Sequence, residues 1–110
     1  MRFIENPART VTQFGSRGLT ARHLVRGEDL AVTVLRVEAD GEIGRHPATV
    51  DQLFIVVAGR GAVCGGDGRW QPIASGEAVL WTAGEPHTTR ADEALVAVVV
   101  EMASLADAVS

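Results

Sequence analysis

The stretch DGEIGRHPATVDQLFIVVAGRG, which runs from Asp40 to Gly61, decides the fold of this chain. It opens with a glycine-containing turn, leads to His46 in extended sequence, and then enters an apolar run that ends at a second glycine cluster. Alternate side chains of a strand point to opposite faces, so Gln52 and Phe54 should share one face. The intervening positions are also apolar, so both faces should be covered. This pattern predicts a strand whose polar end points into the cavity of a small β-barrel.

A second stretch, GEAVLWTAGEPH from Gly76 to His87, repeats this design. An apolar strand is again followed by a glycine turn and a histidine. Trp81 lies six residues before His87, where it either stacks on a ligand at the barrel mouth or packs in the core. Glu85 is expected to cap the loop between them.

Short β-branched runs separated by Gly, Pro or Asp predict an all-β sandwich or barrel, because helical periodicity is weak until the last residues. The tail from Ser104 to Val109 is expected to form one helical turn with Ser104 as its N-cap. The predicted strands are Arg2–Ile4, Val11–Phe14, Leu19–Arg26, Ala31–Glu38, Gln52–Ala58, Ala62–Cys64, Trp70–Ala74, Ala78–Thr82, Pro86–Arg90 and Ala94–Glu101. The segment Ala39–Gly41 is expected to turn the chain.

Length and composition indicate one globular domain over residues 1–110. Apolar residues make up 46%, charged residues 22%, and there are 12 glycines. No apolar run reaches the ~20 residues that span a bilayer, and the N-terminus lacks a signal-peptide core. We therefore expect a cytoplasmic protein that does not contact a membrane.

Charge and residue usage exclude several functions. The net charge is −4 and no basic stripe is present, so nucleic acid is not an expected partner. All ten basic residues are Arg, and the absence of Lys excludes Schiff-base chemistry and a Walker-type phosphate loop. The single cysteine, Cys64, excludes an intramolecular disulfide and a cysteine-based zinc site, and is expected to be a small buried hydrophobe.

The two stretches together resemble the cupins, which are small jelly-roll β-barrels with two signature motifs. The first motif spans about residues 41–59 and the second about residues 76–91. The positions that match the motif spacings are Gly41, His46, Ala48, Gln52 and Gly59, followed by Gly76, Thr82, Gly84, His87 and Ala91. The resemblance covers about residues 31–101 and implies an all-β cupin jelly-roll β-barrel or sandwich.

The resemblance also implies a metal site, of which this chain keeps only part of the ligand set, so that the site is either lost or repurposed. Cupins that bind a metal supply two His and one Glu from the first motif and one His from the second. Carried over by position, His46 and His87 are kept, whereas Ala48 replaces a His and Gln52 replaces the Glu. A neutral amide lacks the charge neutralisation of a carboxylate, so the affinity for a metal should be well below that of the complete set.

Two interpretations of the histidine pair stay open. In one, a divalent transition metal (Zn, Mn, Fe, Ni or Cu) binds His46 and His87, with Gln52 or His23 as the third ligand. In the other, the pair holds an organic ligand or acts as acid and base without metal. His23 lies outside both motifs and is expected to be an ordinary strand or interface histidine.

The favoured function is binding of a small organic molecule by His46, Gln52, Phe54, Trp81 and His87. The alternative is a metal-dependent cupin enzyme of the dioxygenase, isomerase or decarboxylase type, and the choice between ligand binder and enzyme stays open. A structural or regulatory protein with a filled barrel is a third interpretation. Strands 52–58 and 94–100 are apolar on both faces, so a second subunit should cover their outer faces. We therefore expect a homodimer, which is also what the resemblance implies.

Overall fold

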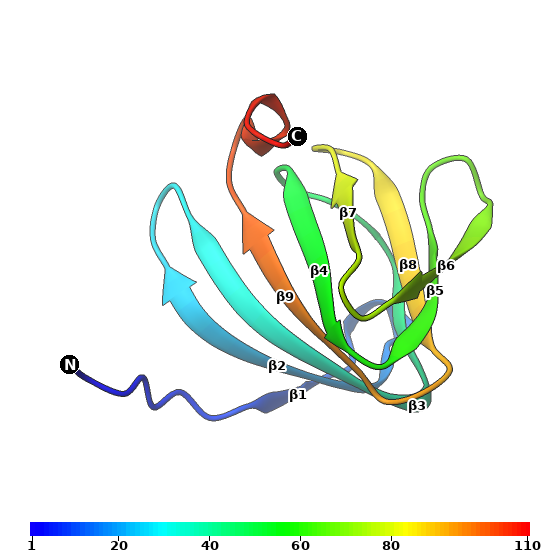
Figure 1. Cartoon of the computed structure of the whole chain (residues 1–110), viewed down its shortest axis with the longest axis horizontal. Coiled ribbons are helices and arrows are strands. Elements are labelled where there is room, and N and C mark those ends of the chain that lie inside the picture. Colours follow the sequence, from blue (N-terminus) through cyan, green and yellow to red (C-terminus); the bar gives the residue numbers. More distant parts are fainter.

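The computed structural model describes residues 1–110, which form a nearly closed antiparallel β-barrel (Figure 1). The predicted all-β jelly-roll class is therefore confirmed. No helix is long and apolar enough to cross a membrane. The elements are β1 (Arg9–Val11), η1 (Gln13–Gly15), β2 (Arg17–Arg26), β3 (Ala31–Pro47), β4 (Gln52–Ala58), β5 (Arg60–Cys64), β6 (Trp70–Ala74), β7 (Ala78–Trp81), β8 (Pro86–Ala91), β9 (Leu95–Glu101) and η2 (Leu105–Asp107), where η marks a 3-10 turn.

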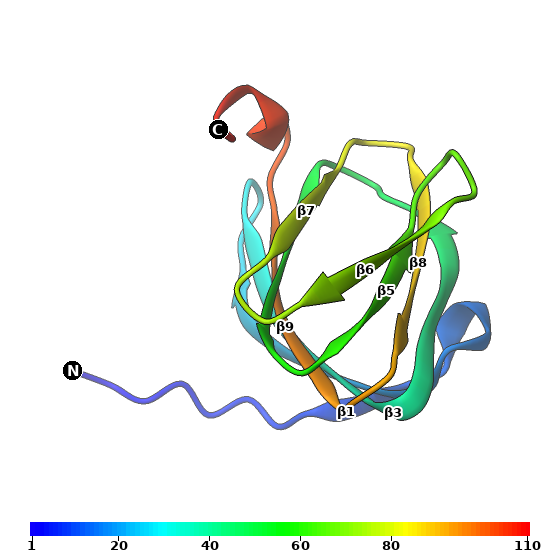
Figure 2. The ribbon, with the colours of Figure 1, turned by 45° about the vertical axis from the view of Figure 1, so that its right-hand side comes forward.

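The long strand β3 joins the two sides of the barrel. The strand order is β6-β5-β8-β3-β9-β4-β7, and β2 and β1 continue outward from β3. The first part of β3 pairs with β2 and β9, and its last part pairs with β8 (Figure 2). This crossing sets His46 on β3 directly opposite His87 on β8.

The strand predictions hold for most of the chain and fail near the N-terminus. The predicted bounds of Gln52–Ala58 match β4. Arg2–Ile4 is not a strand, and the predicted strand Val11–Phe14 is only the last residue of β1 followed by η1. The segment around Asp40 is not a turn either. Asp40 has a φ of 65°, which makes a local irregularity inside a continuous β3.

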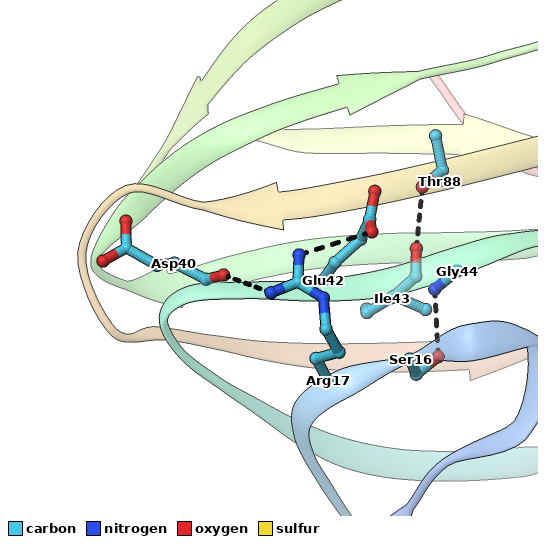
Figure 3. A network of polar contacts seen from close by, with 7 residues as sticks. All are labelled: Ser16, Arg17, Asp40, Glu42, Ile43, Gly44 and Thr88. Atoms are coloured by element: carbon cyan, nitrogen blue, oxygen red, sulfur yellow. Dashed lines mark hydrogen bonds and ion pairs between the residues drawn. The ribbon is translucent and has the colours of Figure 1, made fainter.

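A set of polar contacts fixes the last part of β3 (Figure 3). The Ser16 hydroxyl accepts a hydrogen bond from the Gly44 N–H at 2.9 Å, and the Thr88 hydroxyl donates to the Ile43 carbonyl at 2.7 Å. Arg17 contacts the Glu42 carboxylate at 3.6 Å and donates to the Asp40 carbonyl. These contacts hold the backbone just before His46 between η1 and β8.

The apolar core occupies the part of the barrel next to the cavity described below. Val37, Val56 and Leu95 are fully buried and do not line that cavity. The inward face of β4, with Gln52, Phe54 and Val56, is buried as its alternation predicts.

The C-terminal turn is held by an aspartate and not by the predicted serine cap. Ser104 has a φ of 61° and makes no side-chain cap. Instead, Asp51 accepts hydrogen bonds from the N–H groups of Ala106 and Ala83, both at 2.9 Å. These two bonds favour the ionised carboxylate and lower the pKa of Asp51. Asp51 thereby ties the tail and the loop after β7 to the start of β4.

Candidate functional site

A cavity of about 210 Å³ lies inside the barrel. The five residues that the sequence predicts as a ligand site, His46, Gln52, Phe54, Trp81 and His87, all line it. They come from four strands, β3, β4, β7 and β8, so the barrel closure brings them together. The rest of the lining is largely apolar and comes mainly from β2, β3 and β9.

Five rings contact one another in a row along the cavity. Phe14 stacks on His46 with ring centroids 4.9 Å apart, and His87 stacks on Trp81 at 4.2 Å. His46 and His87 lie 4.4 Å apart with tilted rings, and Phe54 meets Trp81 at 5.1 Å. Trp81 is 3% exposed, so the two interpretations of it coincide: it packs in the core and also lines the cavity.

Backbone carbonyl groups determine which nitrogen of each histidine carries the proton. Nδ1 of His46 lies 2.7 Å from the Gly44 carbonyl oxygen, and Nδ1 of His87 lies 3.0 Å from that of Glu85. A carbonyl oxygen only accepts, so both Nδ1 atoms must be protonated donors. In a neutral imidazole the Nε2 atom is then an acceptor. Neither Nε2 atom has a hydrogen-bond partner in the protein. Every fully buried polar side-chain atom does have a partner, so the two Nε2 atoms are not fully buried and open onto the cavity.

His87 is held in its neutral form. It is 3% exposed, and burial disfavours the imidazolium, which lowers the pKa of His87. The hydrogen bond to the Glu85 carbonyl and the negative charge of the Glu85 carboxylate oppose this effect, while the positive charge of Arg45 adds to it. A neutral His87 keeps its Nε2 lone pair at physiological pH.

Gln52 is paired with a carboxylate that the sequence interpretation missed. The Gln52 side-chain nitrogen donates to Glu101 Oε1 at 2.7 Å, which leaves the amide oxygen of Gln52 as an acceptor. The two residues are opposite each other on β4 and β9. The signal for Glu101 was present, because it continues the alternation of Leu95, Ala97 and Val99 on the inward face.

His23 lies on strand β2, as expected, and it also lines the cavity. Its Nε2 lies 3.0 Å from Arg9 Nη2, and its Nδ1 lies 3.0 Å from the Thr33 hydroxyl. Arginine only donates, so Nε2 accepts and Nδ1 donates to Thr33. Burial lowers the pKa of His23, and Arg26 and Arg9 lower it further. The alternation of Leu19, Ala21 and His23 on one face was the available signal.

Phe14 is a third residue that the sequence interpretation did not place at the site. It lies in η1 with a φ of 59° and is 64% exposed at the edge of the cavity. The chain approaches Gly44 so closely here that a Cβ atom at Gly44 would overlap the Phe14 carbonyl oxygen. A bulkier residue at position 44 would therefore displace Phe14 from His46.

Other candidates lie outside the cavity. Cys64 is buried, as predicted, and does not line it. Glu85 caps its loop, as predicted, by accepting the Thr82 N–H at 3.2 Å. Trp70 is 40% exposed beneath the guanidinium of Arg90.

The donor set does not fit the metal site that the cupin resemblance implies. No three His, Cys, Asp or Glu side chains are placed together to hold a metal ion. His46 and His87 offer two imidazoles, and the third group is the neutral amide of Gln52. Both ring nitrogens of His23 already have partners, so it cannot serve as the third ligand without losing one. The Glu101 carboxylate is held by the Gln52 amide, so a divalent ion would meet three neutral ligands, which disfavours binding.

The change Gln52→Glu should create metal affinity. It would place a carboxylate beside His46 and His87, and Glu101 is adjacent to it. We expect zinc to bind the variant at least about tenfold more tightly than the wild type, measured by calorimetry and elemental analysis of untagged protein. Gln52→Met is the matched control and should not gain affinity. Stoichiometric metal in the wild type, lost on His87→Ala, would contradict this account.

Comparisons with known proteins identify the family and the fold. The model of the Cupin domain family (Cupin_2) matches residues 31–102. No curated protein sequence matches the chain. A conserved protein of unknown function from Streptococcus pyogenes, SPY1581, has a similar structure with 27% identity, a TM-score of 0.73, and coverage of 94% of this chain and 96% of that one.

Two further structures share the fold at lower identity. The polyketide cyclase RemF from Streptomyces resistomycificus is 22% identical with a TM-score of 0.81, over 93% of this chain and 79% of that one. A predicted oxalate decarboxylase from Thermotoga maritima is 16% identical with a TM-score of 0.77, over 89% and 94%. The family match and the barrel show that this chain belongs to the Cupin domain family.

Proposed function

We propose that this cupin binds a small organic molecule in its barrel cavity. The ligand contacts the aromatic side chains of Phe54 and Trp81 and is oriented by His46, His87 and Gln52. The observation that carries the proposal is the pair of Nε2 lone pairs that open onto the cavity without a partner in the protein. Two acceptors side by side without a partner in the protein are available to a donor from outside the chain.

The form of the cavity supports the same function. Small-molecule sites are concave and mostly apolar, with a few polar groups that fix the orientation of the ligand. A purely structural protein would have a filled barrel, whereas a cavity of about 210 Å³ remains here. The ligand-binding interpretation is favoured over the structural one for this reason.

The alternative is a metal-dependent enzyme of the dioxygenase, isomerase or decarboxylase type. The likeness to a polyketide cyclase and to a predicted oxalate decarboxylase extends to the fold at 22% and 16% identity. Function depends on the site and not on the fold. The two-imidazole donor set disfavours the metal-dependent alternative at this site.

The ligand-binding proposal is tested by screening a library of small metabolites against the purified protein. A ligand present at 100 times its Kd should stabilise the fold by about 2.7 kcal/mol, which is measurable as a shift in Tm. His46→Ala and His87→Ala should lose that shift while remaining folded by circular dichroism. Arg60→Ala is the control, because Arg60 is exposed and pairs only with Glu93 outside the cavity. The proposal fails if every ligand found stabilises the histidine variants as much as the wild type.

We also propose that the chain forms a homodimer through the outer face of β3, β9 and β4. Val34, Val98 and Ile55 lie opposite one another across these strands and are partly exposed. Val57, on the same face of β4, is 49% exposed. Covering such a row of aliphatic side chains removes apolar area from water, at about 25 cal/mol per Å².

The change Val98→Glu should convert the dimer to a monomer, because it places a charge in the middle of this face. Light scattering coupled to size exclusion measures the mass directly. Gln71→Glu, on the exposed face of β6, is the control and should leave the dimer intact. A wild-type protein that stays monomeric at about 100 μM, well above the Kd of a stable dimer, would refute the proposed interface.

A further inference from the structure

The polar end of the cavity presents hydrogen-bond acceptors with few free donors. The Nε2 atoms of His46 and His87 are acceptors, because their Nδ1 protons are given to backbone carbonyls. The Gln52 amide oxygen is a third acceptor, because the amide nitrogen is held by Glu101. Glu101 itself, as a carboxylate, only accepts.

Two of the donors that line the cavity already have partners within the chain. Arg9 Nη2 is held by His23, and the Nδ1 proton of His23 goes to Thr33. The Gln13 amide and the hydroxyl groups of Ser16 and Thr89 can also donate or accept. The two Nε2 atoms nevertheless have no donor from within the chain. A ligand that satisfies this cavity must therefore bring hydrogen-bond donors of its own.

The charges in the cavity balance, which points to a neutral ligand. Arg9 and Glu101 are the only residues of the lining with a fixed charge. Their charges are opposite, so the sum over the lining is zero. A charged ligand would add a net charge to a lining whose fixed charges sum to zero, and burying a lone charge is costly.

The aromatic side chains that line the cavity and its volume indicate that the ligand contains a planar ring. Trp81, Phe54 and Phe14 give aromatic surfaces on which a planar ring can pack. A cavity of roughly 150 Å³ is enough to bind benzene. The cavity of about 210 Å³ therefore accommodates one aromatic ring with polar substituents.

We propose that the cavity binds a neutral aromatic ring with two adjacent hydroxyl groups, which donate to His46 Nε2 and His87 Nε2. The two imidazole centroids are 4.4 Å apart, so neighbouring substituents of one ring reach both acceptors. Gln52 Oε1 selects for a third donor where the ligand has one. This assignment of a ligand class rests on the proposed small-molecule function of the same cavity.

The test compares catechol, its dimethyl ether and benzoate by calorimetry with the wild-type protein. EDTA and an oxygen-free buffer prevent chelation of trace metal and oxidation of catechol. Methylation removes both donors but keeps the ring, so catechol should bind at least about tenfold more tightly than the ether. Benzoate should also bind more weakly than catechol, because its carboxylate faces acceptors.

The variant His87→Phe tests the role of the imidazole. It keeps a ring that can stack on Trp81 but removes one of the two acceptors, so the preference for catechol over the ether should fall several-fold, by about the net contribution of one hydrogen bond. The comparison of the three ligands on the wild type does not depend on this variant, and so the proposal stays testable if the variant does not fold.

Equal binding of catechol and its ether, or tighter binding of benzoate, would overturn the assigned ligand class. The small-molecule function would survive if a compound without hydroxyl groups bound in a way that depends on His46 and His87. Failure of the three compounds and of the metabolite screen alike would overturn both proposals.

Discussion

The carbonyl oxygens of Gly44 and Glu85 determine the chemistry of the cavity. Each accepts the Nδ1 proton of a histidine two residues further along the chain, and so each leaves an Nε2 lone pair directed at the cavity. Both carbonyls are fixed by the fold. The Ser16 hydroxyl holds the Gly44 N–H, and the Ala48 N–H donates to the same Glu85 oxygen at 3.0 Å. The jelly-roll closure therefore sets the direction of both imidazoles before any ligand enters.

The loss of two family ligands changes what this arrangement does. Two imidazoles fixed through Nδ1 are suitable metal ligands, but two alone do not neutralise a divalent ion. With Ala48 and Gln52 in the ligand positions, the same lone pairs are better matched to donors of an organic molecule. The barrel thus keeps the orientation of the histidines while the neighbouring residues determine whether a metal or a ligand suits them.

Local patterns in the sequence predicted the strands and the residues that lie on them. Period-two alternation placed Gln52 and Phe54 on the inward face of β4, and motif spacing brought His46 and His87 to one cavity. Alternation also puts Leu19, Ala21 and His23 on one face of β2, but it did not identify His23 or Glu101 as residues of the cavity. The break expected at Asp40 was also wrong, since pairing resumes at Glu42 on the far side of the irregularity.

The remaining features depend on contacts between distant segments. Phe14 reaches His46 only because η1 packs on the backbone of Gly44, and no local signal marks that approach. The pairing of Gln52 with Glu101 and of Arg9 with His23 follows from strand register, which the sequence alone leaves open. Sequence patterns are therefore informative about which face a side chain occupies, and much less so about its partner.

The protonation state of the two histidines is the most direct test of the central claim that the polar end of the cavity accepts hydrogen bonds. Two-dimensional NMR that correlates the ring nitrogens with the carbon-bound ring protons distinguishes the two neutral tautomers and the imidazolium. We expect both rings to carry their proton on Nδ1, as the contacts with the Gly44 and Glu85 carbonyls require, with Nε2 shifts that move when a donor ligand is added. Protonation of Nε2 in either ring, in the absence of ligand, would contradict the account.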